Sequence, residues 1–90
     1  MALGDRILKV TKVHIFRNDP VDAIVDWELY IQAAVVGQIL VQLGQVPFSL
    51  GAQSSALNLT LLQIRNQAVT AVTNAHTNGL YGIPDYDTIT

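Results

Sequence analysis

Charged residues are almost absent from the middle of this 90-residue chain. None lies from Leu29 through Ile64, and Arg65 is the only one between Glu28 and Asp85. Charged residues make up 13% of the whole chain, against about 25% in a typical soluble domain. The hydrophobic share of 50% is too high for a disordered chain, because disorder combines low hydrophobicity with high charge. The composition predicts a folded domain with an unusually uncharged surface.

Cysteine is also absent, which excludes disulfide bonds and thiolate metal ligands. The two histidines, His14 and His76, cannot form a zinc site without carboxylate help. We interpret His14 as a packed or surface residue of a strand, and His76 as a residue suited to the C-terminal end of a helix dipole. A chain of this length has a thin core. Since small domains without disulfides or metals commonly gain stability by associating, we expect an oligomer.

Groups that could support catalysis are scarce. Ser54 and Ser55 have no histidine beside them in the sequence, so nothing indicates a nucleophile paired with a base. The glycines do not form a phosphate-binding loop. Asp85 and Asp87 could bind a hard cation through their carboxylates, but no third acidic residue is near them, and a solvated tail explains both. We expect no enzymatic activity, no catalytic or metal-binding residue, no cofactor and no small-molecule substrate.

The charge balance and the apolar stretches bear on nucleic acids and membranes. The net charge is −2, and the four basic residues near the N-terminus are flanked by five acidic ones, whereas nucleic-acid binding needs a basic patch. Residues 29–46 include four glutamines, and a membrane-spanning helix needs about 20 mainly apolar residues. The N-terminal residues MALGDR do not resemble a signal peptide. We expect no nucleic-acid binding, no membrane insertion and no secretion through a signal peptide.

Three segments have the features of β-strands. The first is rich in β-branched residues, and the second alternates apolar and polar residues with a period of two. Pro47 ends or edges the third. Residues 29–44 also fit a helical stripe, which stays open as an alternative. The expected strands span residues 6–17, 23–36 and 39–48.

Gly37 and Gln38 fit a two-residue hairpin turn between the second and third strands. This turn pairs Val36 with Ile39 on one face, where the residues far from the turn are polar. On the other face it produces almost wholly apolar pairs. This second face is therefore the expected core face, with the pairs Val35–Leu40, Leu29–Val46 and Trp27–Phe48.

A helical pattern follows the third strand. Ser54 or Ser55 can cap its start, and Asn78-Gly79 is a typical stop signal. Apolar residues recur between them at spacings of four and three, which predicts a helix over residues 54–78. The face expected to pack on the sheet consists of Leu57, Leu61, Ile64, Ala68, Ala71 and Ala75.

Residues 80–90 contain Gly82 and Pro84 and no periodicity, so we interpret them as an extended C-terminal arm. The whole chain, residues 1–90, then forms a single α+β domain. Its expected architecture is a three-stranded antiparallel β-meander followed by one long α-helix and the arm.

Two apolar regions remain once the core is assigned. One is the outer face near the hairpin turn, and the other is a second apolar line along the helix. Exposed together they would favour aggregation, so we expect partner subunits to cover at least one of them. Tyrosine is enriched at such contacts. The candidate interface residues are Tyr30, Val36, Ile39, Val41, Leu43, Leu59, Leu62, Val69, Val72, Tyr81 and Tyr86.

In overall style the chain resembles the small virion proteins of tailed bacteriophages. Those proteins are often short, cysteine-free, rich in Gln, Asn and Thr, and tied to their neighbours by terminal arms. The resemblance covers the whole chain and consists of composition and layout, without a diagnostic motif. It implies a capsid decoration, head–tail or tail protein, located in the virion and assembled in the host cytoplasm. Its partners are then copies of itself and other subunits of the assembly.

Two other functions fit the sequence less well. The chain could be a small cytoplasmic homo-oligomer that binds an apolar ligand between sheet and helix. It could also be a minimal enzyme whose active site is shared between subunits, although it has few acid–base groups to share. The predicted function is therefore that of a non-enzymatic structural subunit that works by packing against other subunits.

Overall fold

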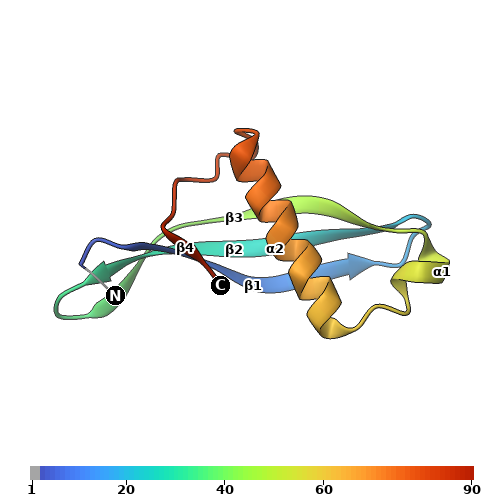
Figure 1. The fold of residues 1–90 in the computed structure, drawn as a ribbon, viewed down its shortest axis with the longest axis horizontal. Helices are drawn as coiled ribbons and strands as arrows, with labels where there is room; N and C mark the ends of the chain where they lie inside the picture. The colour runs from blue at the N-terminus through green and yellow to red at the C-terminus, as the bar shows by residue number, and fades with distance from the viewer. Residues whose placement is uncertain (1–2) are drawn as a thin grey trace.

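The computed structural model describes residues 3–90. Met1 and Ala2 lie outside the described residues, although they are part of the predicted domain and of the N-terminal segment that was compared with a signal peptide. The strands form one four-stranded sheet in the order β3-β2-β1-β4, in which β4 runs parallel to β1 and the other pairs are antiparallel. Helix α2 crosses one face of this sheet (Figure 1). The elements are β1 (Arg6–Phe16), β2 (Val21–Ala33), β3 (Gly37–Gly51), α1 (Gln53–Ala56), α2 (Leu61–Thr77) and β4 (Thr88–Ile89).

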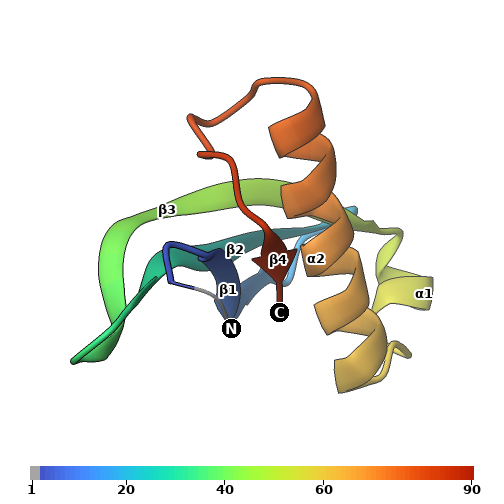
Figure 2. The same cartoon turned by 60° about the vertical axis from the view of Figure 1, so that its left-hand side comes forward.

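The α+β class is confirmed, but the three-stranded antiparallel meander is wrong because the tail adds a fourth, parallel strand. Residues 80–90 do not extend away from the domain. They turn back from the end of α2 to lie beside β1 (Figure 2). Thr90 N donates to Leu8 O at 2.9 Å, and Val10 N donates to Thr90 O at 2.9 Å. The predicted arm is therefore part of the chain's own sheet.

The β2–β3 hairpin turns at residues 34–36, and Gly37 pairs with Ala33. The predicted two-residue turn at Gly37-Gln38 is wrong. Gly37 instead ends a three-residue turn with a φ of 79°, a left-handed conformation that glycine adopts without steric cost. As a result Trp27 lies opposite Gly44 rather than Phe48.

This register differs from the expected one by four residues along most of the hairpin. A shift by an even number keeps each side chain on its predicted face. Away from the turn the predicted core face is therefore correct, although the predicted turn is wrong. Trp27, Leu29 and Val46 are buried, and Phe48 packs against the same core.

Near the turn the faces change. Val41 is an extra residue between the pairs Tyr30–Leu40 and Leu29–Gln42, and such a β-bulge shifts the register by one residue. Leu40 therefore joins Tyr30 on the outer face. The predicted core pair Val35–Leu40 is wrong, because Val35 is 95% exposed and Leu40 is 44% exposed.

The helical region is divided in two, so the single helix over residues 54–78 is also wrong. Thr60 caps α2 with a reciprocal pair of hydrogen bonds. Gln63 N donates to Thr60 Oγ1 at 3.2 Å, and Thr60 N donates to Gln63 Oε1 at 2.9 Å. This capping box satisfies two backbone donors at a helix start, and it ends the regular pattern that begins at Ser54.

The packing face of α2 consists of small residues, with Ala68, Val72 and Ala75 buried. Val72 was predicted to lie at an interface, and this prediction is wrong because it is fully buried against the sheet. Leu57 and Leu61 were predicted to pack on the sheet but are exposed. Leu57 lies outside both helices, and Leu61 is the first residue of α2.

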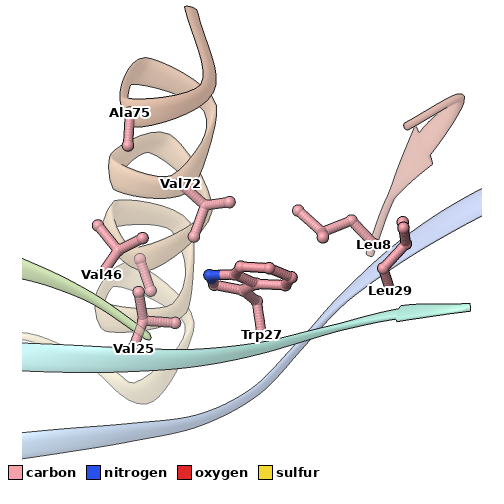
Figure 3. Packing of buried hydrophobic residues seen from close by; sticks show 8 residues of the cluster. Leu8, Val25, Trp27, Leu29, Val46, Val72 and Ala75 are labelled. Carbon is pink, nitrogen blue, oxygen red and sulfur yellow. The ribbon is translucent and has the colours of Figure 1, made fainter. Parts of the chain in front are cut away.

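The main core lies between α2 and the sheet, and Trp27 is at its centre (Figure 3). A second, smaller cluster lies at the end of the sheet near α1, where Val21, Ala23, Leu50 and Ala56 are buried. Both clusters lie on the helix side of the sheet. The hairpin tip projects beyond the main core at the opposite end of the molecule from α1 (Figure 1).

Candidate protein–protein contact surface

The turn of the β2–β3 hairpin consists of Ala34, Val35 and Val36. Val35 is 95% exposed and Val36 is 68% exposed. Turns are normally built from Gly, Asn, Asp, Pro and Ser, each of which stabilises a turn conformation. Valine has no such role, since its branched side chain favours strands. The turn conformation therefore does not explain these two residues, which project apolar groups into solvent.

The strand after the turn continues this apolar surface. Gly4 N donates to Gln32 O at 2.9 Å, which brings the exposed Leu3 beside the turn. No charged residue occurs from residue 33 to residue 43. We call the exposed apolar set the tip surface, and it consists of Leu3, Val35, Val36, Ile39, Leu40, Val41 and Leu43.

The tip surface includes part of a sheet edge, because among residues 3–90 only β2 pairs with β3. Exposed edges are usually protected by charged side chains, proline or bulges. β3 has no charge, but it has the bulge at Val41 and a proline at Pro47. Both interrupt backbone pairing with another strand. The surface is therefore suited to contact through side chains rather than through an added strand.

Beside the tip surface, the outer face of the sheet is polar. Tyr30 OH donates to Glu28 Oε1 at 3.2 Å, and Lys9 Nζ lies 4.6 Å from the centre of the Tyr30 ring. Lys9 Nζ also donates to Gln38 Oε1 at 2.6 Å. Loss of solvent around Tyr30, together with the bond to Glu28, raises the pKa of its hydroxyl. The polar network marks one boundary of the apolar surface.

A second polar group on this face surrounds Asp26. His14 Nε2 lies 3.0 Å from Asp26 Oδ2, and Gln45 Nε2 donates to Asp26 Oδ1 at 2.9 Å. The hydrogen bond with His14 is the main reason that the pKa of Asp26 is lowered. An open hollow of about 530 Å³ lies above these residues and reaches Lys12 and Leu43.

The two aspartates of the tail, Asp85 and Asp87, also pair within the chain. His76 lies in the last turn of α2, as predicted, and its Nε2 is 2.9 Å from Asp85 Oδ1. Arg6 N donates to Asp87 Oδ2 at 2.8 Å. Within residues 3–90, no group of three or more His, Asp or Glu side chains is arranged to hold a metal ion.

At the other end of the molecule, against the second core cluster, lies an apolar hollow of about 310 Å³. Its only charged lining residue is Arg17. The exposed Leu57 forms part of its rim. We call this hollow the end hollow, and it is lined by Ile15, Arg17, Val21, Leu50, Ala56, Leu57, Leu59 and Ile64.

The structure brings some of the predicted interface residues together. Val36, Ile39, Val41 and Leu43 all belong to the tip surface, with Tyr30 beside it. They do not share one face as predicted, because the bulge places Ile39, which pairs with Ile31, on the helix side of the sheet, whereas Leu43 pairs with Glu28 on the outer face. The other members lie elsewhere: Leu59 lines the end hollow, Leu62 is exposed on α2, Val69 is half-buried on α2, Tyr81 is exposed in the tail and Tyr86 packs against the core.

Sequence reasoning missed the most exposed residue of the tip, Val35, and the whole end hollow. The expected register placed Val35 in the core, and only the position of the turn could have corrected it. The T-L-L-Q motif at Thr60 was a readable sign that the helix starts late. A late start leaves Leu57 and Leu59 free to line a hollow.

Comparison of the chain with protein-family models, with curated proteins and with solved structures gives no match. Among residues 3–90, no helix has both the length and the apolar character needed to cross a membrane.

Proposed function

We propose that this chain is a non-enzymatic structural subunit that works by packing against other protein subunits. The observation that carries the proposal is the tip surface, where seven large apolar side chains, each 44–95% exposed, cover both faces of the hairpin end with no charged residue among them. Exposed apolar patches on a monomer mark contact sites or favour aggregation. The polar network around Tyr30 and Glu28 stops the surface at a defined boundary, as in the polar rim of an interface.

The resemblance to tailed-phage virion proteins directs the proposal to a capsid decoration, head–tail or tail position. The lack of cysteine, the low charge and the small size support this version. The tail supports it less, because residues 80–90 complete the chain's own sheet. Sedimentation of particles from a lysate of the producing cells tests this version. We expect the chain among the particles, and a chain found wholly in the soluble fraction would contradict it.

The broader proposal is tested by measuring molar mass with light scattering as the protein concentration rises. We expect the wild-type chain to associate at micromolar concentration, and Leu43→Lys to shift association to at least about tenfold higher concentration, because a desolvated lysine opposes contact. Leu43 is 66% exposed, so the fold should tolerate the change. Asn66→Lys on the exposed side of α2 is the control and should behave as wild type. A wild-type chain that stays monomeric would contradict the proposal.

A second candidate function is the binding of an apolar ligand by a small homo-oligomer. The end hollow favours it, because ligand sites have volumes of about 300–1,000 Å³ and mainly apolar walls, and this hollow has about 310 Å³. The space under α2 does not favour it, since Trp27 and Val72 fill that space. Titration with a medium-chain fatty acid, followed by calorimetry, tests this candidate. We expect Leu57→Lys to abolish any binding at the end hollow.

A further inference from the structure

We propose that copies of this chain join end to end, with Val35 and Val36 of one copy seated in the end hollow of the next. This inference rests on the proposed function, because it names the partner and the contact of the same subunit. It assigns one role to two features that the fold itself leaves unexplained, the apolar turn and the apolar hollow.

The projecting part of the contact is the turn at residues 34–36. Val35 is 95% exposed, so its side chain makes almost no contact within its own chain. The turn lies at one end of a molecule that measures 48 × 25 × 15 Å, and it is the outermost part of the hairpin at that end (Figure 1). It can therefore enter a hollow without a clash from the body of its own domain.

The receiving part is the end hollow, which has a fitting size and chemistry. An apolar cavity of about 150 Å³ accepts a group as large as benzene. The hollow offers about 310 Å³, enough for the two isopropyl groups of Val35 and Val36. Seven of its eight lining residues are apolar. Burying two valines there removes apolar surface from water on both sides, which favours association.

Arg17 is the one charged residue at the hollow. Within residues 3–90 it makes no hydrogen bond or ion pair, and its side chain is exposed. A guanidinium has five donors and no acceptor, so it can donate to backbone carbonyls of an incoming turn. The turn has no charged side chain, and nothing on it repels Arg17.

The position of the two parts determines the kind of assembly. The turn lies at the end of the long axis opposite to α1 (Figure 1), and the end hollow is lined by Ala56 of α1 and by Leu57, which follows it. One copy therefore cannot join the two within itself. A contact between two different patches is head-to-tail, and it closes into a ring or continues as a filament. Pairing of two β3 edges is the competing arrangement, but the bulge at Val41 and Pro47 interrupt that edge.

The test uses two variants that each disable one part of the contact. Val35→Lys alters the turn, and Leu57→Lys alters the rim of the hollow, where Leu57 is 59% exposed. We expect each variant alone to raise the apparent Kd of association at least about tenfold. An equimolar mixture retains one intact turn and one intact hollow. It should therefore form a dimer of one copy of each, and no larger species, in light scattering.

The controls are Asn66→Lys on the exposed side of α2 and Leu61→Lys, 87% exposed on α2; neither residue is part of the lining. Both should associate as wild type does. Tryptophan fluorescence of Trp27 should be the same in all variants, which shows that they are folded. A mixture that stays monomeric, while the wild type associates, overturns the end-to-end contact and leaves the proposed function intact.

Further results distinguish a second copy of this chain from a membrane as the partner of the turn. Association of Val35→Lys that equals that of the wild type overturns the inference. A wild-type chain that never associates overturns both the inference and the proposed function. Flotation with vesicles of neutral and anionic phospholipids tests a membrane as the occupant of the tip. Binding of the wild-type chain but not Val35→Lys to vesicles, without self-association, would also overturn the inference.

Discussion

At the scale of single residues, the contact between Trp27 and Gly44 organises the core. The indole ring of Trp27 lies against β3 where Gly44 has no side chain. A Cβ atom at Gly44 would lie 2.5 Å from Trp27 Cζ2, which is closer than carbon atoms can pack. Trp27 Nε1 is buried without a hydrogen-bond partner in the described part of the chain. The packing of the ring therefore outweighs the cost of an unpaired donor.

Gly44→Ala should destabilise the fold. The methyl group overpacks a rigid, buried ring, and such substitutions cost about 1–3 kcal/mol. Urea unfolding followed by tryptophan fluorescence measures the free energy of unfolding. Leu43→Ala, which trims an exposed side chain on the same strand, is the control and should change it little. Equal stability of Gly44→Ala and the wild type would show that Trp27 can move aside.

Asp26→Asn should lower stability in a pH-dependent way. Because the pKa of Asp26 is lowered in the folded chain, its charged form stabilises the fold above the unfolded pKa of about 3.9. That stabilisation is lost as the pH falls through the folded pKa. The partly exposed position of its side chain limits this stabilisation to about 1 kcal/mol or less. The gap in stability between wild type and Asp26→Asn should therefore be present near neutral pH and vanish in acid.

At the scale of elements, the capping box sets where α2 begins, and the tail adds a strand to the sheet. The capping box at Thr60 makes α2 start at Leu61, so the segment before it is free to line the end hollow. The tail returns to the sheet, where Ile83, Tyr86 and Ile89 pack against the main core. Both features make contacts within the domain and stabilise it whether or not a partner binds.

Deletion of residues 83–90 should destabilise the domain itself. It removes β4 and uncovers Leu8, which is fully buried. Loss of several partly buried large side chains costs more than about 2 kcal/mol. Hydrogen exchange gives a local reading, because the amide of Val10 donates to Thr90 O and should lose its protection. Thr88→Ala, an exposed change within β4, is the control. Unchanged stability after the deletion would restore the interpretation of this segment as a free arm.

At the scale of the whole molecule, one sheet and one helix make a long, thin domain. Its radius of gyration is 14.5 Å, whereas a compact domain of 90 residues has about 12 Å. The excess comes from strands that extend beyond the helix at both ends (Figure 1). These ends contain the tip surface and the end hollow, so the shape itself separates the candidate contacts from the core.

Association of the chain should respond to salt as an apolar contact does. Sodium chloride screens charged pairs, but the tip surface has no charge, so physiological to high concentrations should not weaken association. Sulfate should strengthen it and cooling should weaken it, because both act on apolar burial. Light scattering across salt and temperature measures this. A steep loss of association with sodium chloride would indicate a contact built on Lys9, Lys12 or Arg17 instead.

The sequence by itself determined the α+β class, the strand face of Trp27, Leu29 and Val46, and the uncharged surface. The period of two along β2 identifies its buried face whatever the exact pairing, since the register changed by an even number of residues. Only the tertiary structure decided the turn, the bulge at Val41, the burial of Val72 and the return of the tail. Each depends on contacts between distant segments. The helix face is set by how α2 crosses the sheet, and an aperiodic tail is placed only by the strand that it pairs with.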